Sequence, residues 1–290
     1  MGLKELVQTT PGARTVLAGP LALRRAWMRY RAEPASRIID RLGSFVVSDV
    51  RVKVPEFEGE FYIGPKSHLL ARILRNGEYE REIAHLFLSK VKPDRDVLDI
   101  GANIGFFSVL AAKHLTTGRV LAAEPTQGAV QRLRTNLEVN GVANKVIVFN
   151  GLVGDARGEH ELHVVPGREE YSSIGNLVHP SVRGQAAQVE TIGTLTLDDL
   201  VEMHGLKPAL LKVDVEGAEA KVLAGAQKVL TEHRPIVLSE LAEPLLRSSG
   251  SSPAEVVAML ERCGYDVRDA SDETRSAAGL TYGEIIAVPR

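Results

Sequence analysis

The feature of this chain that most constrains its fold is an apolar strand, a glycine turn and a helix at residues 97–108. The strand carries Asp99 near its end, and Gly101 and Gly105 then form the turn. A second apolar strand follows and ends in Glu124. In an α/β sheet, neighbouring parallel strands end at one edge, and ligands bind there. The two carboxylates and the glycines therefore predict a site for a nucleoside-like cofactor.

The glycine spacing and the acid before it indicate which cofactor fits. A dinucleotide site has the pattern G-x-G-x-x-G and seats a pyrophosphate at the helix N-terminus, whereas this chain has Gly101-x-x-x-Gly105. Asp99 would repel a pyrophosphate but suits S-adenosylmethionine, which has an ammonium group, a sulfonium and no phosphate. We expect Glu124 to accept hydrogen bonds from the ribose hydroxyls. The pattern favours a methyl-donor site over a dinucleotide site or a purely structural turn. The expected cofactor-binding residues are Tyr79, Asp99, Gly101, Ala102, Asn103, Gly105, Glu124, Asn150 and Asp214.

From about Asp94 onward the hydrophobic pattern alternates between strands and helices. This alternation predicts an α/β fold of the Rossmann-like kind, a mainly parallel sheet with helices on both faces. The expected helices run from the glycine turn to His114 and then over 127–140, 219–230 and 253–263. The expected strands are 96–100, 119–123, 146–150, 209–215, 236–240, 266–269 and 284–288.

Residues 1–76 do not follow this alternation, and we take them as an N-terminal extension of a catalytic domain at 77–290. The extension is expected to hold a helix over 21–42 and then a β-hairpin, packed on the catalytic sheet. The helix contains a basic run, which could contact a membrane surface or an acidic partner, but a solvated helix is the more ordinary interpretation. Within the domain, short alternating runs over about 159–194 predict a β insertion with a polar loop.

A second acidic segment follows the apolar strand that contains Lys212. That strand delivers Asp214 and Glu216 to the ligand-binding edge, Gly217 permits a sharp turn, and Glu219 begins the next helix. Three carboxylates within six residues repel one another unless a cation or a ligand balances them. Lys212 alternates with the acids along the strand and need not share their face. The alternative interpretation is that these acids only cap and turn the chain.

These motifs together resemble those of FkbM-type S-adenosylmethionine-dependent methyltransferases, over about residues 78–289. The most family-specific stretch is Lys-x-Asp-x-Glu-Gly-x-Glu at 212–219. The resemblance implies a class I methyltransferase fold, with seven strands of which the last is antiparallel. It also implies O-methylation of hydroxyls on sugars, polyketides or related metabolites. One departure from the family pattern is Ser239, just before Glu240. The other matching pieces are Glu78-Tyr79-Glu80, VLDIGANIGFFS, Ala123-Glu124-Pro125 and Ile286-Ala287-Val288-Pro289.

An alcohol becomes a good nucleophile only as its proton leaves, so O-methylation needs orientation and a base. We expect Glu216 to be the base or to orient the acceptor, with Asp214 beside it. His179, in the loop of the β insertion, is the competing candidate, since an unperturbed imidazole titrates near neutrality. No metal ligand is predicted, although a divalent ion is left open. The alternative functions are a non-catalytic S-adenosylmethionine-binding module of a biosynthetic complex and an N-methyltransferase.

Composition limits the partners of the chain. Its formal net charge of -2 over 290 residues argues against nucleic acid, so the expected substrate is a small molecule or a glycan. The single cysteine, Cys263, cannot form an internal disulfide, which favours the reducing cytoplasm. No apolar run approaches the ~20 residues that cross a bilayer. The sequence leaves a homo-oligomer open.

Overall fold

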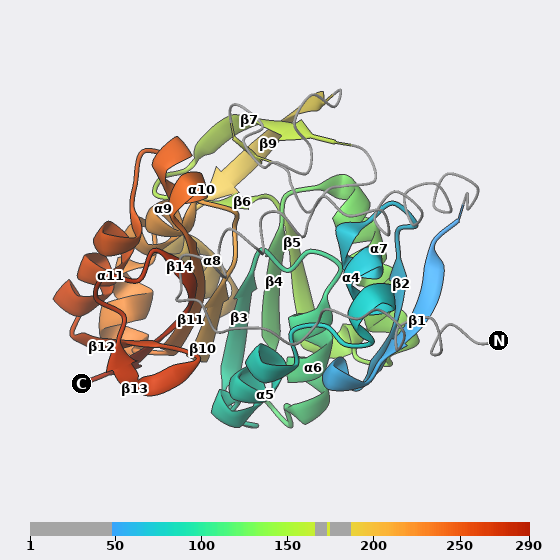
Figure 1. Cartoon of the computed structure of the whole chain (residues 1–290), viewed down its shortest axis with the longest axis horizontal. Helices are drawn as coiled ribbons and strands as arrows, with labels where there is room; N and C mark the ends of the chain where they lie inside the picture. The colour runs from blue at the N-terminus through green and yellow to red at the C-terminus, as the bar shows by residue number, and fades with distance from the viewer. Residues whose placement is uncertain (1–47, 166–172, 175–186) are drawn as a thin grey trace, which may run out of the picture. The chain divides into compact units, whose positions relative to one another are not determined.

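A computed structural model describes residues 48–165, 173–174 and 187–290, and these belong to one compact unit, Val46–Arg290. Its centre is an eight-stranded sheet with the strand order β13-β12-β14-β11-β10-β3-β4-β5 (Figure 1). The expected helix over 21–42 lies outside the described residues. The strands of this sheet are β3 (Asp96–Ile100), β4 (Val120–Glu124), β5 (Val146–Asn150), β10 (Pro208–Val213), β11 (Ile236–Ala242), β12 (Tyr265–Asp269), β13 (Asp272–Ser276) and β14 (Tyr282–Pro289).

The sheet is mainly parallel, as the sequence predicts. Strands β5, β4, β3, β10 and β11 pair parallel to one another, and β14 is antiparallel to both β11 and β12. The class I methyltransferase arrangement, with an antiparallel last strand, is therefore confirmed. The expected number of seven strands is wrong by one for this sheet. The extra strand β13 pairs antiparallel with β12, and all its residues are exposed, so it has no apolar alternation from which it could be predicted.

Eight α-helices pack around this sheet and at its edges within the described part of the chain. The helix after the glycine turn is as expected, and α9 is shorter than the predicted helix over 219–230. It ends at Ala224, and a π-helical turn, Val229–His233, follows; the Asp198 carboxylate accepts from the N–H groups of Lys228 and Val229. The helices are α4 (His68–Asn76), α5 (Arg81–Lys90), α6 (Phe106–His114), α7 (Gln127–Val139), α8 (Leu197–His204), α9 (Glu219–Ala224), α10 (Glu243–Ser248) and α11 (Pro253–Arg262).

The two faces of the sheet carry two separate cores, which we call the α6-side core and the α9-side core. The α6-side core includes side chains of α4 to α7, and the α9-side core includes side chains of α8 to α11. Consecutive strand residues enter opposite cores: Val97 and Leu210 enter the first, Leu98 and Leu211 the second. Such strands, buried on both faces, explain the continuous apolar runs in the sequence.

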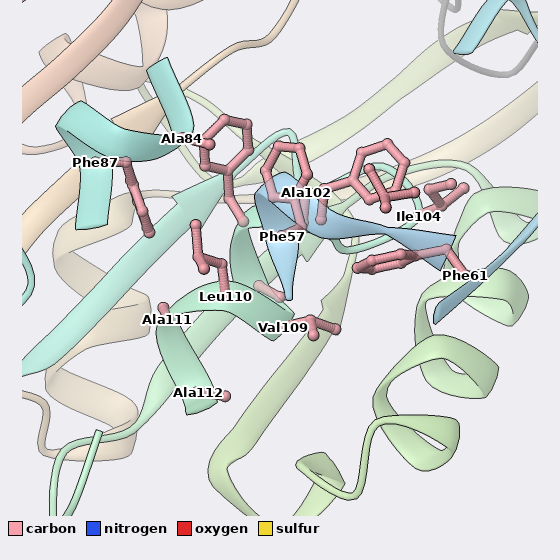
Figure 2. Packing of buried hydrophobic residues seen from close by; sticks show 14 of the residues in the cluster. Phe57, Phe61, Ala84, Phe87, Ala102, Ile104, Val109, Leu110, Ala111 and Ala112 are labelled. Carbon is pink, nitrogen blue, oxygen red and sulfur yellow. The ribbon is translucent and has the colours of Figure 1, made fainter. Parts of the chain in front are cut away.

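The expected β-hairpin before the catalytic core is present. It consists of β1 (Val50–Val54) and β2 (Gly59–Ile63), joined by the short 3₁₀ helix Pro55–Phe57. Figure 2 shows Phe57 and Phe61 of the hairpin packed into the α6-side core. The Phe57 ring stacks on the Phe106 ring at a centroid distance of 4.8 Å. The hairpin therefore shares its hydrophobic core with the helix that begins at the glycine turn.

The expected β insertion also forms a sheet, next to the central one. Its strands are β6 (Leu152–Val153), β7 (Gly158–Val164), β8 (Ser173–Ile174) and β9 (Gln188–Leu195), in the order β6-β9-β7-β8. Strands β7 and β9 pair antiparallel over the whole length of β7 (Figure 1). Of the helices in the described ranges, none combines the length and apolar character needed to span a bilayer.

Candidate functional site at the carboxyl edge of the sheet

The glycine turn after β3 has an unusual backbone that its sequence permits. Gly101 and Gly105 have φ of 84° and 93°, and Asn103 between them has φ of 49°. The N–H groups of Gly101 and Ala102 both donate to the Ala123 carbonyl, each at 2.9 Å, which ties the turn to the end of β4. A Cβ on Gly101 would lie 2.8 Å from the carbonyl carbon of Asp214 and closer still to its oxygen. Glycine is therefore required at position 101 by the protein's own packing.

Glu124 at the end of β4 is held in one position by neighbouring donors. Its Oε2 accepts from the Asn103 N–H at 3.0 Å, and its Oε1 accepts from the Thr126 N–H at 3.0 Å and hydroxyl at 2.6 Å. Burial raises the pKa of Glu124, and the hydrogen bonds from Thr126 and Asn103 oppose that shift. Thr126 directly precedes α7, and its hydroxyl donates to Glu124 and makes no capping bond to the helix. The carboxylate thus stands fixed at the edge beside the glycine turn.

Asp99 is almost fully buried on β3. Its Oδ2 accepts from the Ser108 hydroxyl at 2.6 Å, while Oδ1 is buried and has no hydrogen-bond partner among the described residues. Burial raises the pKa of Asp99, and the Lys212 ammonium and the Ser108 hydroxyl lower it. A buried oxygen without a donor costs free energy, so its presence at a candidate site calls for an explanation such as a ligand donor.

The structure corrects the expectation for Lys212, which does share a face with an acid. Its Nζ lies 2.9 Å from Oδ2 of Asp214, because residues two apart on a strand point to the same side. The Nζ also lies 4.6 Å from the centroid of the Phe107 ring. Burial opposes the charge on Lys212, but the carboxylates of Asp214 and Asp99 and of two further acids outweigh it and raise the pKa of the lysine.

The turn after β10 is shaped by Glu219. Its Oε1 accepts from the N–H groups of Val215 and Gly217, at 3.2 and 3.1 Å, while Oε2 is buried without a partner among the described residues. Burial raises the pKa of Glu219 to about 7. Glu216 lies inside this turn with φ of 51°, and Gly217 follows with φ of 106°. Left-handed backbone at a non-glycine residue is uncommon and often marks functional positions.

Tyr79 and Glu80 lie directly before α5 and meet the edge from the side of the hairpin. Tyr79 is buried with its ring 5.3 Å from that of Phe106, and the guanidinium of Arg72 lies 4.6 Å from the Tyr79 ring centroid. Glu80 pairs with the same guanidinium at 3.4 Å and has φ of 47°. Burial, together with the charge of Asp214, raises the pKa of Glu80. Arg72 carries no sequence signal of its own and is not among the predicted residues.

Glu240 and Glu284 form a second acidic pair that the sequence does not predict as a unit. They are register partners on the antiparallel strands β11 and β14, so their side chains lie on one face of the sheet. Burial raises the pKa of both groups, to about 8 for Glu284, and the charge of Asp214 adds to each shift. Only the antiparallel pairing of the last strand could have revealed this pair.

The roles of two further predicted residues, Asn150 and His179, stay predictions. The Asn150 side-chain amide donates to the carbonyls of Glu124 and Pro125, at 3.1 and 2.9 Å, which ties the end of β5 to β4. Its contact with the cofactor stays a prediction. His179 lies outside the described residues, so its part as a competing base also stays a prediction. Among the residues that the structure covers, no group of three or more His, Cys, Asp or Glu side chains is arranged to hold a metal ion.

The charged side chains of the edge lie on one face of the sheet. Val97, Leu210, Leu238 and Ile286 all enter the α6-side core. Side chains alternate along a strand, so the residues two positions after the first three, which are Asp99, Lys212 and Glu240, point to the same face. Glu284 also points there, because β14 is antiparallel and Glu284 lies two positions before Ile286. This face is rich in carboxyl groups and could bind and orient a cationic ligand. The residues concerned are Asp99, Lys212, Glu240 and Glu284.

Comparison with known proteins gives a family match across this edge. A family model described as the methyltransferase FkbM domain matches residues 99–267, which include both the glycine turn and the acidic segment after β10. The matched range covers more than half of the chain. It begins at Asp99 in β3 and ends within β12, so the last two strands, β13 and β14, lie outside the matched range.

Curated relatives are similar over parts of their length. The chain is 29% identical over 248 residues to the AMB antimetabolite synthetase AmbE of Pseudomonas aeruginosa, covering 72% of this chain and 12% of that protein. It is 30% identical over 201 residues to methyltransferase sdnD of Sordaria araneosa, covering 61% and 76%. It is 28% identical over 153 residues to the 2-O-methyltransferase NoeI of Sinorhizobium fredii, covering 49% and 62%. The chain thus spans less than two thirds of AmbE and of NoeI.

Proposed function

The chain belongs to the FkbM methyltransferase family, and on that premise we propose that it transfers the methyl group of S-adenosylmethionine to a hydroxyl of a small metabolite or sugar. The observation that carries the proposal is the pair of carboxylates, Asp99 and Glu124, at the carboxyl ends of adjacent parallel strands beside the glycine turn. The relative NoeI is a 2-O-methyltransferase, which supports a hydroxyl acceptor.

The residues of this edge fit a donor with a cationic amino acid portion. Oδ1 of Asp99 is buried without a partner among the described residues, and an ammonium group is the kind of donor that would satisfy it. Glu124 is already fixed by Asn103 and Thr126, and its Oε2, which accepts one hydrogen bond from the described residues, keeps acceptor capacity for a ribose hydroxyl. The absence of phosphate from the donor agrees with the negative charge of the whole edge.

The chemistry divides between the donor and the chain. When bound, S-adenosylmethionine supplies a methyl group made electrophilic by its sulfonium. Glu216 is the proposed group that orients the acceptor hydroxyl and takes its proton, with Asp214 beside it. A positioned base contributes typically ~10²–10⁴-fold, whereas holding the reactants together can contribute about 7–11 kcal/mol. Orientation of the acceptor by the loop after β10 is therefore the larger part of the proposed role.

The experiment combines donor binding with transfer of a labelled methyl group. Calorimetry with S-adenosylmethionine and its demethylated product should give binding that Glu124→Ala weakens. A panel of hydroxylated metabolites and sugars, incubated with donor labelled in the methyl group, with and without chelator, should then reveal the acceptor. Glu216→Gln should keep the donor affinity of the wild-type chain and lose turnover. Glu202→Gln, an exposed glutamate on α8, is the matched control and should behave as wild type.

The outcomes separate the alternatives. Absence of binding by either ligand rejects the proposal. Donor binding without transfer to any hydroxyl compound or extract favours a non-catalytic binding module. Label recovered on amines or on protein side chains favours N-methylation, and full turnover in Glu216→Gln moves the role of base elsewhere, first to His179.

A further inference from the structure

The buried cation of the site, Lys212, has no part in the proposed reaction so far. It lies on β10 in register with Asp99 of β3, and its side chain is 7% exposed. Its Nζ is 2.9 Å from Oδ2 of Asp214 and 4.6 Å from the centroid of the Phe107 ring at the start of α6. The ammonium thus lies between two carboxylate-bearing strands and over an aromatic face, a favourable environment for a cation.

The carboxylates around Lys212 come from separate segments of the chain. Asp99 lies on β3, Asp214 follows β10, Glu80 precedes α5 and Glu284 lies on β14, and each favours the charged form of Lys212. The influence is mutual, because the ammonium lowers the pKa values of Asp99, Glu80 and Glu284. A single cation therefore acts on acids that meet only in the folded protein.

Stability alone does not account for a lysine at this position. Burying an ammonium is costly, and replacing a buried ion pair by apolar side chains of similar volume is often neutral or stabilising. The second core, on the other face of the sheet, has the apolar Leu211 and Val213 at the neighbouring positions of the same strand. A charge kept on the α6-side face of β10, next to the carboxyl edge, points to a role in the site.

We propose that Lys212 is a positioning residue: it holds Asp214 by a direct ion pair and places its ammonium beside Asp99, so that the edge presents a fixed arrangement of carboxylates to the donor ammonium. This inference rests on the proposed function, because it takes the donor to be S-adenosylmethionine. Lys212 itself need not touch the donor. Its effect passes through the two aspartates that flank it.

The first test measures donor affinity against pH in three variants. Lys212→Met removes the charge, and Lys212→Arg keeps it. Lys228→Met is the matched control, because Lys228 is an exposed lysine just before the π-helical turn that follows α9. Without the ammonium, Asp99 should take up its proton at higher pH and lose its attraction for the donor. Calorimetry measures the affinity of each protein for S-adenosylmethionine at pH 8 and at pH 6. The loss of affinity between these two pH values should be roughly tenfold larger in Lys212→Met than in wild type. Lys212→Arg should restore the wild-type profile.

A second test needs no ligand and so separates this inference from the proposed function. Carbon-detected NMR of protein with ¹³C-labelled aspartate carboxyls follows the titration of Asp99, assigned with Asp99→Asn. The Asp99 midpoint should lie at higher pH in Lys212→Met than in wild type, in Lys212→Arg or in Lys228→Met. Should Lys212→Met fail to fold, Lys212→Gln removes the charge and keeps a polar side chain beside Asp214, with Asp99 again as the reporter.

The outcomes are distinct. The Asp99 midpoint could rise in Lys212→Met although the wild-type chain binds no S-adenosylmethionine. That result supports the positioning role of Lys212 and rejects S-adenosylmethionine as the donor. An unchanged Asp99 midpoint in Lys212→Met, or in Lys212→Gln where Lys212→Met does not fold, overturns the inference even if the donor binds. Failure of a folded Lys212→Arg to restore the wild-type titration also overturns it, because the effect then comes from side-chain shape and not from charge.

Discussion

The glycine turn offers the sharpest quantitative prediction, because Gly101 is constrained in two separable ways. Its φ of 84° is a left-handed conformation, which costs an L-residue with a side chain about 1–2 kcal/mol. In addition, a Cβ would come within 2.8 Å of the Asp214 carbonyl carbon, whereas ordinary contacts are about 3.5–4.0 Å. The neighbour is backbone at a strand end, so the Gly101→Ala substitution must displace one of the two main chains.

The displacement should break hydrogen bonds that join the three strand ends. The Gly101 N–H donates to the Ala123 carbonyl at 2.9 Å, and the Asp214 N–H donates to the Ile100 carbonyl at 2.9 Å. Leaving a buried backbone group unpaired costs about 1–3 kcal/mol. With the left-handed strain added, we expect Gly101→Ala to lower the free energy of unfolding by about 4 kcal/mol. It should also weaken the binding of S-adenosylmethionine, because the same turn lies beside Asp99.

Gly141 provides the matched control. It has φ of 69°, and a Cβ there would meet nothing within 4 Å. Gly141→Ala should therefore cost only the left-handed strain of about 1–2 kcal/mol and leave donor binding unchanged. Urea denaturation of both variants followed by circular dichroism measures the difference. Equal losses of stability in the two variants would refute the argument that close approach of the Asp214 backbone, and not φ, requires glycine at position 101.

Two further predictions concern stability. Because burial raises the pKa of Glu219 to about 7, from an ordinary value near 4.5, the folded chain binds that proton more tightly than the unfolded chain does. This contribution to stability is complete below about pH 4.5 and is lost as the pH rises through about 7; it amounts to about 3 kcal/mol at most. Glu219→Gln should flatten that decline in denaturation measured from pH 5 to 8, and an unchanged slope would contradict the assignment. Asn136 of α7 is fully buried and joins the hairpin to the glycine turn, through Tyr62 N–H at 2.7 Å and the Ile104 carbonyl at 2.8 Å. Asn136→Leu should lower the unfolding free energy by about 2–4 kcal/mol, whereas the exposed Thr135→Ala should change it little.

Much of the fold follows from the sequence because its strands are buried on both faces. The strand that contains Asp99 and the one that ends in Glu124 appear as short apolar runs separated by helical periodicity, which is enough to predict a parallel sheet. The prediction fails where that pattern is absent. Strand β13 is exposed along its whole length, and the helix expected over 219–230 is interrupted after Ala224.

The site divides along a similar line. Acids that end adjacent parallel strands, such as Asp99 and Glu124, can be predicted to meet, since topology alone brings those ends together. The partnership of Lys212 with Asp214 follows from the two-residue period of a strand, so the expectation that the lysine alternates with the acids is wrong for this pair. Arg72 and Glu284 could not be found in this way. Their approach depends on how α4 and the antiparallel last strand pack, which no local pattern encodes.

The geometry also gives a physical reason for the composition of the acidic segment after β10. The Lys212 ammonium forms an ion pair with the Asp214 carboxylate, and the Glu219 carboxylate accepts hydrogen bonds from two backbone N–H groups of the turn. Gly217, with φ of 106°, leaves no room for a side chain, since a Cβ would lie 2.6 Å from the Leu245 carbonyl oxygen. Asp214 and Glu219 thus have partners that fix them within the fold. Glu216 takes the uncommon left-handed backbone between these two residues, so the turn places it at the carboxyl edge of the sheet. That placement in a constrained backbone is the structural reason to test Glu216 first as the group that handles the acceptor proton.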